Sequence, residues 1–324
     1  MAWWAGAPSS VPTVLRRILL AASGSDRARR LITSAPYARG VVARFVAGDD
    51  AAEAVQVARR LLARGLLVSL DYLGEDTADR EQAAAVAGEY IRLIGRLGAA
   101  GAAEGGRAEV SVKPTAVGLG LPEHGDKTAA ENISRICAAA RDAGTTVTLD
   151  MEDHTHVEAT LRLVAELRRE FPDLGCVIQS GLRRSVSDCL ALAGPGSRVR
   201  ICKGAYRAPE SVAFAARRDV DRSYVRCLRV LLPGPGYPMV ATHDPRLISI
   251  AAAQAGMAGR APGSFEYQML YGVRAAEQQR LADSGAAVRV YLPYGSDWYS
   301  YLVRRLAERP ANFTFFLRSL VTRS

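Results

Sequence analysis

The chain has 324 residues, of which 49% are hydrophobic and 23% charged, and it carries a net charge of +9. This composition is typical of a globular protein with a sizeable core, and the length accommodates one barrel domain of about 250 residues. The arginines are scattered through helical segments, and no charge block or zinc-finger motif is present, so we expect no nucleic-acid binding. The five cysteines include no CxxC pair and are expected to be buried free thiols in a reducing cytoplasm.

Residues 1–64 have apolar positions at helical spacing, as in Leu15, Ile18 and Leu19, and are predicted to form an N-terminal helical arm. Arg16 and Arg17 interrupt the first apolar stretch, whereas a signal peptide places its charges before the apolar region. No apolar run reaches the roughly 18 residues of a membrane span. We therefore expect a cytoplasmic protein.

From residue 65 onward, short apolar runs rich in Val, Ile and Leu alternate with longer helical patterns such as 80–97 and 156–171. The runs cover residues 66–75, 108–114, 145–152, 175–180, 198–206, 238–244, 263–270 and 287–295. Eight such alternations predict an α/β fold, a (β/α)8 barrel of the TIM type over residues 65–324. The alternative is a doubly wound sheet, but no glycine-rich phosphate loop follows the first run.

Polar residues are expected at the C-terminal end of each run, which faces the active site in such barrels. They are Glu75, Lys113, Asp150 with Glu152, Gln179, Lys203 with Tyr206, Thr242 with His243, Glu266 with Gln268, and Tyr291. Polar side chains are costly in buried strands unless they meet partners or ligands, so their repetition predicts a shared pocket.

The segment 296–310 is predicted to be the final helix. Four of its residues fall at i, i+3, i+4 and i+7 and therefore share one face: Tyr301, Arg304, Arg305 and Glu308. Adjacent arginines at a barrel mouth can bind a small carboxylate through bidentate hydrogen bonds. The alternative is an ordinary solvated Arg–Glu face.

The final helix, read as YxxRRxxE, resembles the proline-binding helix of the proline dehydrogenase family. The stretches LDYLGE, SVKP, TLDMED, IQS, RxxKGAY, ATHD, EYQMLYG and VYLPYG resemble that family's strand-end motifs in the same order. The resemblance covers about residues 66 to 316. Within the family, the stretch DWYSYLVRR resembles the monofunctional bacterial branch.

The resemblance implies an FAD-dependent barrel that oxidises L-proline to Δ1-pyrroline-5-carboxylate. The catalytic residues it implies are Asp150, Arg200 and Tyr291, with Arg200 near the reactive edge of the flavin and Asp150 holding Lys113. The substrate-binding residues it implies are Lys113, Tyr206, Tyr301, Arg304, Arg305, Glu308 and Glu75. The cofactor-binding residues it implies are Met151, Gln179, Arg200, Lys203, Gly204, Ala205, Thr242 and His243.

The family also implies partners. Electrons would pass to a membrane quinone, and a separate pyrroline-5-carboxylate dehydrogenase would consume the product. The basic net charge is compatible with peripheral contact at the inner face of the cell membrane. The chain departs from the family at Gly181, where an aromatic residue is usual, which concerns one wall of the flavin pocket.

Three alternatives remain open on the residues alone. Lys113 and Lys203 could form Schiff bases in an aldolase. A metal-dependent hydrolase on the same fold is the second alternative: the stretch 152–156 contains two histidines, but no further histidine ligand beyond His243 is evident, so no metal site is expected. The barrel could also bind a ligand without turning it over.

Overall fold

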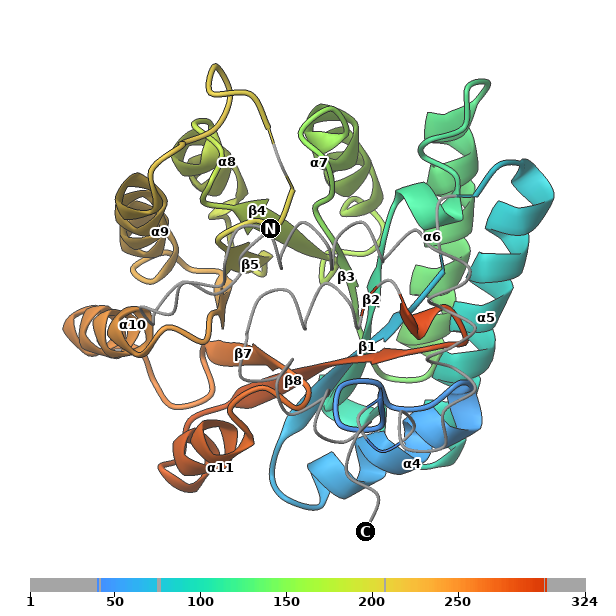
Figure 1. Ribbon diagram of the computed structural model, residues 1–324, viewed down its shortest axis with the longest axis horizontal. Coiled ribbons are helices and arrows are strands. Elements are labelled where there is room, and N and C mark those ends of the chain that lie inside the picture. Colours follow the sequence, from blue (N-terminus) through green and yellow to red (C-terminus); the bar gives the residue numbers. More distant parts are fainter. Residues whose placement is uncertain (1–39, 41, 75–76, 207, 300, 302–324) are drawn as a thin grey trace, which may run out of the picture.

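The computed structural model of the protein describes residues 40, 42–74, 77–206, 208–299 and 301. Eight strands form one closed barrel in which each strand is parallel to its neighbours, in the order β1 to β8 (Figure 1). The strands are β1 (Leu67–Tyr72), β2 (Ala108–Val112), β3 (Val147–Leu149), β4 (Gly175–Gln179), β5 (Arg198–Cys202), β6 (Tyr237–Ala241), β7 (Glu266–Leu270) and β8 (Val288–Tyr294). Each lies within or overlaps one predicted run, so the predicted barrel is confirmed.

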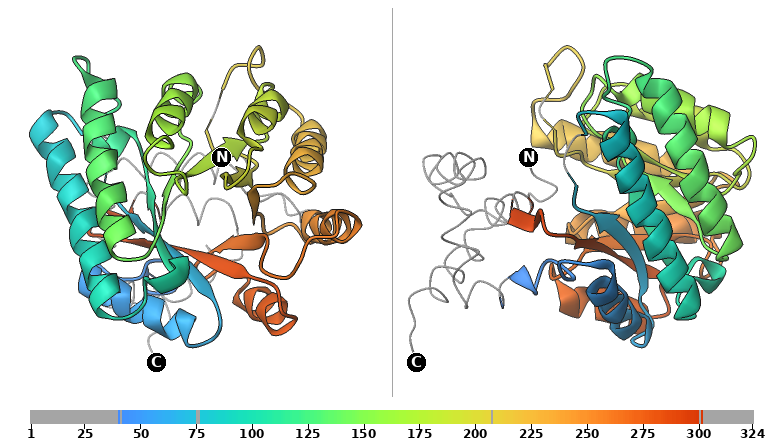
Figure 2. Two further views of the ribbon diagram at one scale, coloured as in Figure 1. Left: turned by 180° about the vertical axis from the view of Figure 1, so that it is seen from behind. Right: turned by 90° about the vertical axis from the view of Figure 1, so that its right-hand side faces the viewer.

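Helices cover the outside of the barrel, because a parallel strand pair needs a crossover connection (Figure 2). They are α4 (Ala51–Leu62), α5 (Arg80–Ala99), α6 (Gly125–Asp142), α7 (Val157–Leu167), α8 (Ser185–Leu192), α9 (Arg217–Leu231), α10 (Pro245–Met257) and α11 (Ala275–Asp283), with short 3-10 turns η1 (Glu104–Gly106) and η2 (Thr115–Val117). None of the helices described has the length and apolar character that crossing a bilayer requires.

Several helices begin at side chains that satisfy the first unpaired amides. The Asp50 carboxylate accepts from Ala52 N and Glu53 N at α4, and Asp79 accepts from Gln82 N at α5. Asp244 accepts from Arg246 N at α10, where Pro245 suits the first helical turn. These caps fix where the chain turns from each loop into the next helix.

Helix α4 packs against β1, β8 and α5, and its buried residues belong to the same apolar core as the barrel strands. It lies between α11 and α5 in the outer ring (Figure 1). Residues 1–39 and 41 of the predicted arm lie outside the described residues, and the boundary at residue 64 stays a prediction.

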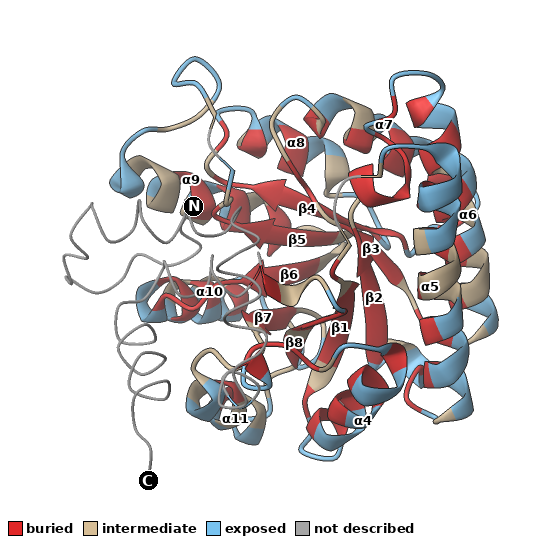
Figure 3. Ribbon diagram, turned by 45° about the vertical axis from the view of Figure 1, so that its right-hand side comes forward, coloured by how far each residue is buried: buried red, intermediate tan, exposed pale blue. Residues whose placement is uncertain are grey.

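The two faces of the strands differ in chemistry. Side chains such as Val68 and Leu70 are buried in the apolar core, while Ser69 and Asp71 make polar contacts across the barrel interior. Strand side chains alternate between faces, so strands such as β1, β2 and β5 present apolar residues to the helices and polar residues to the interior, whereas β6 contributes Met239, whose sulfur lies 3.6 Å from Arg198 Nη2. Figure 3 shows the resulting buried barrel inside helices that are exposed on their outer sides.

Candidate active site

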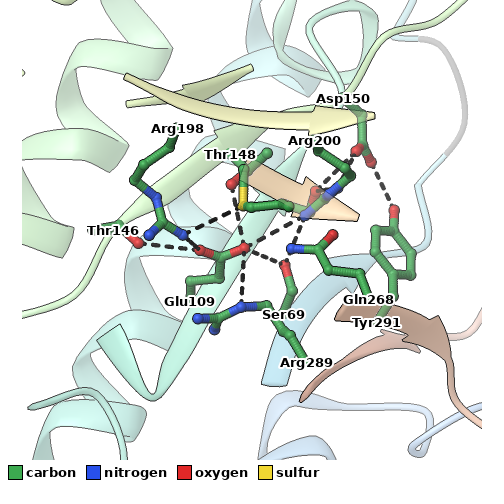
Figure 4. A network of polar contacts seen from close by, with 12 residues as sticks. Ser69, Glu109, Thr146, Thr148, Asp150, Arg198, Arg200, Gln268, Arg289 and Tyr291 are labelled. Carbon is green, nitrogen blue, oxygen red and sulfur yellow. Dashed lines mark hydrogen bonds and ion pairs between the residues drawn. The ribbon is translucent and has the colours of Figure 1, made fainter. Parts of the chain in front are cut away.

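Asp150, directly after β3, joins three polar groups at the C-terminal end of the barrel interior. Its Oδ1 accepts hydrogen bonds from Arg200 Nη1 at 2.7 Å and Ser111 Oγ at 2.9 Å. Its Oδ2 accepts from Tyr291 OH at 2.7 Å, and the Tyr291 ring centroid lies 5.4 Å from Arg200 Cζ (Figure 4). Burial and the charge of Asp150 raise the pKa of Tyr291, so its hydroxyl remains a neutral donor. The structure thus brings together the three residues predicted to be catalytic.

Lys113, which follows β2, forms its ion pair with Asp71 of β1. The prediction that Asp150 holds Lys113 is therefore wrong, because Asp150 instead bonds to Arg200, Ser111 and Tyr291. Burial alone would lower the pKa of Lys113, but the nearby Asp71 and Asp150 carboxylates outweigh it and raise that pKa. Burial raises the pKa of Asp71, and Lys113 acts in the opposite direction. Lys113 is consequently a fixed ammonium at the strand end.

Gln179, at the end of β4, is predicted to contact the cofactor together with Met151. Its amide nitrogen donates to Met151 O at 2.9 Å and Glu152 O at 2.7 Å, which fixes the backbone after β3. Glu152 in turn accepts from Thr115 N at 2.9 Å and Thr115 Oγ1 at 2.6 Å, and burial raises its pKa. This link between the loops that follow β2 and β3 was not predicted.

Lys203, after β5, is 6% exposed and lies in a network of charges. Its Nζ is 2.6 Å from Asp221 Oδ1 and 3.3 Å from Asp244 Oδ2, and Arg246 contacts both carboxylates. Burial alone would raise the pKa of Asp244, but the Arg246 hydrogen bond and the Lys203 charge hold it at about 2. Asp221 was missed because it belongs to helix α9, whereas Asp244 ends the predicted run 238–244 but was not selected, and the structure shows it as the N-cap of α10.

Gly204 and Gly181 mark two close backbone approaches beside Lys203. Gly204 has φ +96°, and a Cβ there would lie 2.7 Å from Gln179 Oε1. A Cβ at Gly181 would lie 2.8 Å from the Lys203 carbonyl oxygen, to which Gly181 N donates. The aromatic residue usual at position 181 would therefore require the backbone to shift. Ala205 follows and is half-buried.

Thr242 and His243 follow β6 and are buried. Thr242 Oγ1 accepts from Asp244 N at 3.1 Å. His243 Nε2 accepts from Leu270 N at 2.9 Å, so the neutral ring carries its proton on Nδ1. Both residues are thus held at the rim where the cofactor is predicted.

The remaining predicted residues are less fully described. Tyr301 is buried with Val42, Phe45, Val46 and Leu73, while Tyr206 is 48% exposed. Four predicted substrate-binding residues lie outside the described residues: Glu75, Arg304, Arg305 and Glu308. Glu266, expected at the C-terminal ends, is the first residue of β7 and pairs with Arg289. That expectation is wrong, because the strand begins at Glu266 and not at residue 263, where the predicted run begins.

The residues at the strand ends fit a flavin dinucleotide. Arg200 is 2% exposed, and its buried Nε has no hydrogen-bond partner among the described residues. The glycines let backbone approach closely, and Lys203 supplies a cation suited to a phosphate. Within the described part of the chain, no three His, Cys, Asp or Glu side chains are grouped as a metal site would require.

Comparisons with known proteins identify relatives of the chain. The proline dehydrogenase family model matches residues 54–318. Proline dehydrogenase 1 of Bacillus subtilis (strain 168) is 38% identical over 278 residues, which cover 86% of this chain and 90% of that protein. Proline dehydrogenase of Deinococcus radiodurans is 40% identical over 280 residues, covering 86% of this chain and 89% of that protein.

Solved structures show the same barrel. Proline utilization A from Bdellovibrio bacteriovorus, inactivated by N-propargylglycine, superposes with a TM-score of 0.76 at 25% identity, covering 83% of this chain. This chain spans 32% of that longer protein. Because the family model spans most of the chain and the curated relatives are matched over nearly their whole length, the chain belongs to the proline dehydrogenase family.

Proposed function

We propose that this chain binds FAD and oxidises L-proline to Δ1-pyrroline-5-carboxylate, the first step of proline catabolism to glutamate. The observation that carries the proposal is the cluster of Asp150, Arg200 and Tyr291 at the C-terminal end of the barrel, in a chain of this family. This is the end at which barrel enzymes place their chemistry.

The residues that would hold FAD lie in β4 and β5 and in the loops that follow β3, β5 and β6. Arg200 would face the isoalloxazine ring through its unpaired Nε, while Gly204 and Ala205 give close backbone approach. Lys203 would contact the more polar part of the cofactor, together with Thr242 and His243. FAD supplies the electron acceptor, and the protein orients the donor carbon and stabilises developing charge.

The substrate would be held by its carboxylate. Arg304 and Arg305 are proposed to bind it as a bidentate clamp, with the Lys113 ammonium as a third positive charge and Glu308 on the same helix face. Tyr291, Tyr206 and Tyr301 would surround the ring, and Glu75 would close over the site by pairing with Arg304.

Arg200 has a second proposed role. A guanidinium beside the ring favours the negative charge that develops there on reduction. Asp150 fixes this guanidinium and the Tyr291 hydroxyl at the same time, so one carboxylate would align the cofactor side and the substrate side of the site.

Electrons are proposed to pass to a membrane quinone, with the protein in the cytoplasm and in peripheral contact with the membrane. A separate pyrroline-5-carboxylate dehydrogenase would take the product. In support of this pathway, the chain is similar to one part of a longer protein that is named as bifunctional. The Bifunctional protein PutA of Escherichia coli is 29% identical over 85% of this chain, which covers 24% of that protein.

The test is an absorbance spectrum of the purified protein before and after L-proline is added without oxygen. A flavin band that bleaches with L-proline, and not with D-proline as the control, supports the proposal. A colourless protein that FAD does not reconstitute overturns it. Borohydride trapping of a carbonyl compound would then test the aldolase alternative, although the Lys113 ammonium is poorly suited to it because a Schiff base requires a neutral amine.

A further inference from the structure

Glu109 of β2 is a completely buried carboxylate inside the barrel, below the candidate active site. Its Oε2 accepts from Arg198 Nη2 at 2.6 Å and Thr146 Oγ1 at 3.1 Å. Its Oε1 accepts from Ser69 Oγ at 3.0 Å and Thr148 Oγ1 at 3.2 Å (Figure 4). Neither the predicted site nor the proposed function uses this residue.

The Oε1 side of Glu109 reaches Arg200. Arg200 Nη2 lies 3.4 Å from Glu109 Oε1 and donates to Ser69 Oγ at 3.3 Å. The other terminal nitrogen, Nη1, bonds to Asp150 and Ser111. The guanidinium is therefore held from two directions, and a planar group held at both terminal nitrogens has a fixed orientation. That orientation decides where the unpaired Nε points.

The charges around Glu109 make its ionised form necessary. Burial alone would raise the pKa of Glu109, but Arg289, Arg198 and Arg200 outweigh burial and hold the pKa at about 2. The carboxylate is therefore negative at any working pH. Without it, Arg198 and Arg200 would share the interior with less compensating charge, and the repulsion would displace them.

We propose that Glu109 is a positioning residue for proline oxidation, which orients Arg200 toward the flavin from below while Asp150 holds it from above. This inference rests on the proposed function. Glu109 contacts neither the strand-end residues that would bind FAD, other than Arg200, nor those that would bind proline. Its effect on the reaction must therefore pass through Arg200.

Glu109→Gln and the matched control Glu266→Gln test the inference. Both remove one fully buried carboxylate charge of the interior, but Glu266 pairs with Arg289 and does not contact Arg200. We expect Glu109→Gln to lower kcat about tenfold with KM for proline within about twofold, because a misplaced group is costly at the reacting centre. Glu266→Gln should leave both constants within about twofold while losing comparable stability.

The midpoint potential of the bound FAD separates positioning from a simple field effect. Removal of a negative charge alone would raise the potential, because reduced flavin would be better stabilised. Displacement of the Arg200 cation from the ring would lower it. We expect a lower potential in Glu109→Gln and an unchanged one in Glu266→Gln; a raised potential in Glu109→Gln would overturn the inference.

A milder pair of variants covers the case in which Glu109→Gln does not fold. Ser69→Ala removes the hydroxyl that bridges Glu109 Oε1 and Arg200, whereas Thr146→Val removes a hydroxyl from the Oε2 side. Ser69→Ala should lower both kcat and the midpoint potential of FAD, as expected for Glu109→Gln. Thr146→Val should change neither. Equal effects of the two would overturn the inference.

A double-mutant cycle completes the test. If Glu109 acts through Arg200, Ser69→Ala and Glu109→Gln should have little effect on kcat when each is combined with Arg200→Lys. Additive losses would overturn the inference while the proposed function stands. Failure of the unmodified protein to bind FAD or to be reduced by proline would overturn both.

Discussion

The polar interior of the barrel has two levels, which differ in the partners of their charged groups and in their position along the barrel. In the lower level, around Glu109 and Glu266, both carboxylates are paired within the protein, and we call this level closed: Glu266 bonds to Arg289, Tyr237 and Gln268, and Arg289 also donates to backbone carbonyls. The upper level, around Asp150, has a buried Arg200 Nε without a partner among the described residues. Arg198 Nε of the lower level is also buried without such a partner, so the two levels differ in position rather than in pairing alone. The upper level lies at the C-terminal end of the barrel, where barrel enzymes bind their ligands, and we call it open for that reason.

Glu266→Ala is the strongest test of the closed level. The change leaves the buried Arg289 without its closest carboxylate, and breaking a buried pair in this way costs about 3–5 kcal/mol. Urea unfolding should show that loss of stability, while kcat of the folded protein at 25 °C stays within about twofold. Unchanged stability would mean that the backbone carbonyls, or the Glu109 carboxylate 3.8 Å from Arg289 Nε, compensate Arg289.

The acid response of the closed level follows from Glu109. Its pKa is about 2 in the folded protein against an ordinary 4.5, so its stabilisation is fully present above pH 4.5 and is lost as pH falls toward 2. The shift corresponds to about 3 kcal/mol. The difference in thermal midpoint between the unmodified protein and Glu109→Gln should narrow as pH falls below 4.5. A difference that stays constant with pH would contradict this.

Asp150→Asn addresses the open level. The amide cannot supply the negative charge that anchors Arg200, so we expect flavin reduction by proline to slow about 10²-fold, equivalent to about 2.7 kcal/mol. Stopped-flow absorbance measures this rate. Asp188→Asn on α8, which removes a carboxylate paired with Arg184, is the control and should leave the rate unchanged. Equal rates of flavin reduction in the two variants would mean that Asp150 has no role in the reaction.

Gly204→Ala probes the rim of the open level with the smallest expected effect. The positive φ and the 2.7 Å approach of a Cβ to Gln179 Oε1 should cost about 1–2 kcal/mol, seen chiefly as weaker FAD binding by fluorescence titration. Gly196→Ala has a similar φ of +72° with no atom within 4 Å, and should leave FAD affinity unchanged. Equal losses of affinity would show that backbone strain alone is responsible.

The barrel was predictable because buried parallel strands form continuous apolar runs, and all eight such runs are strands. The upper level was predictable in part: Asp150, Arg200 and Tyr291 meet as expected. The partner of Lys113 was not, because β2 has two neighbouring strands, and the sequence does not say whether Asp71 or Asp150 lies nearer.

The lower level was missed although the sequence carried a signal for it. Polar residues recur at every second position in the strands, as in Glu109, Ser111 and Lys113, or in Arg198 and Arg200. An alternation within otherwise apolar runs indicates an inward polar face, but only the strand ends were considered. Glu266 was misplaced for a different reason: the predicted run begins at residue 263, whereas β7 begins at Glu266, so this residue lies at the N-terminal end of the strand.

The alternation also bears on how the barrel closes. Ser69 lies opposite Glu109 across the β1–β2 pair, and Gln268 lies opposite Arg289 across β7–β8. A slip of β2 by one residue would turn Glu109 toward the helices and Val110 inward, leaving Arg198 without its counter-charge and Arg200 with Asp150 alone. A barrel with a wrong register is therefore destabilised by unpaired buried charges as well as by the loss of apolar packing. The interior charges thus select a single alignment of the strands during folding.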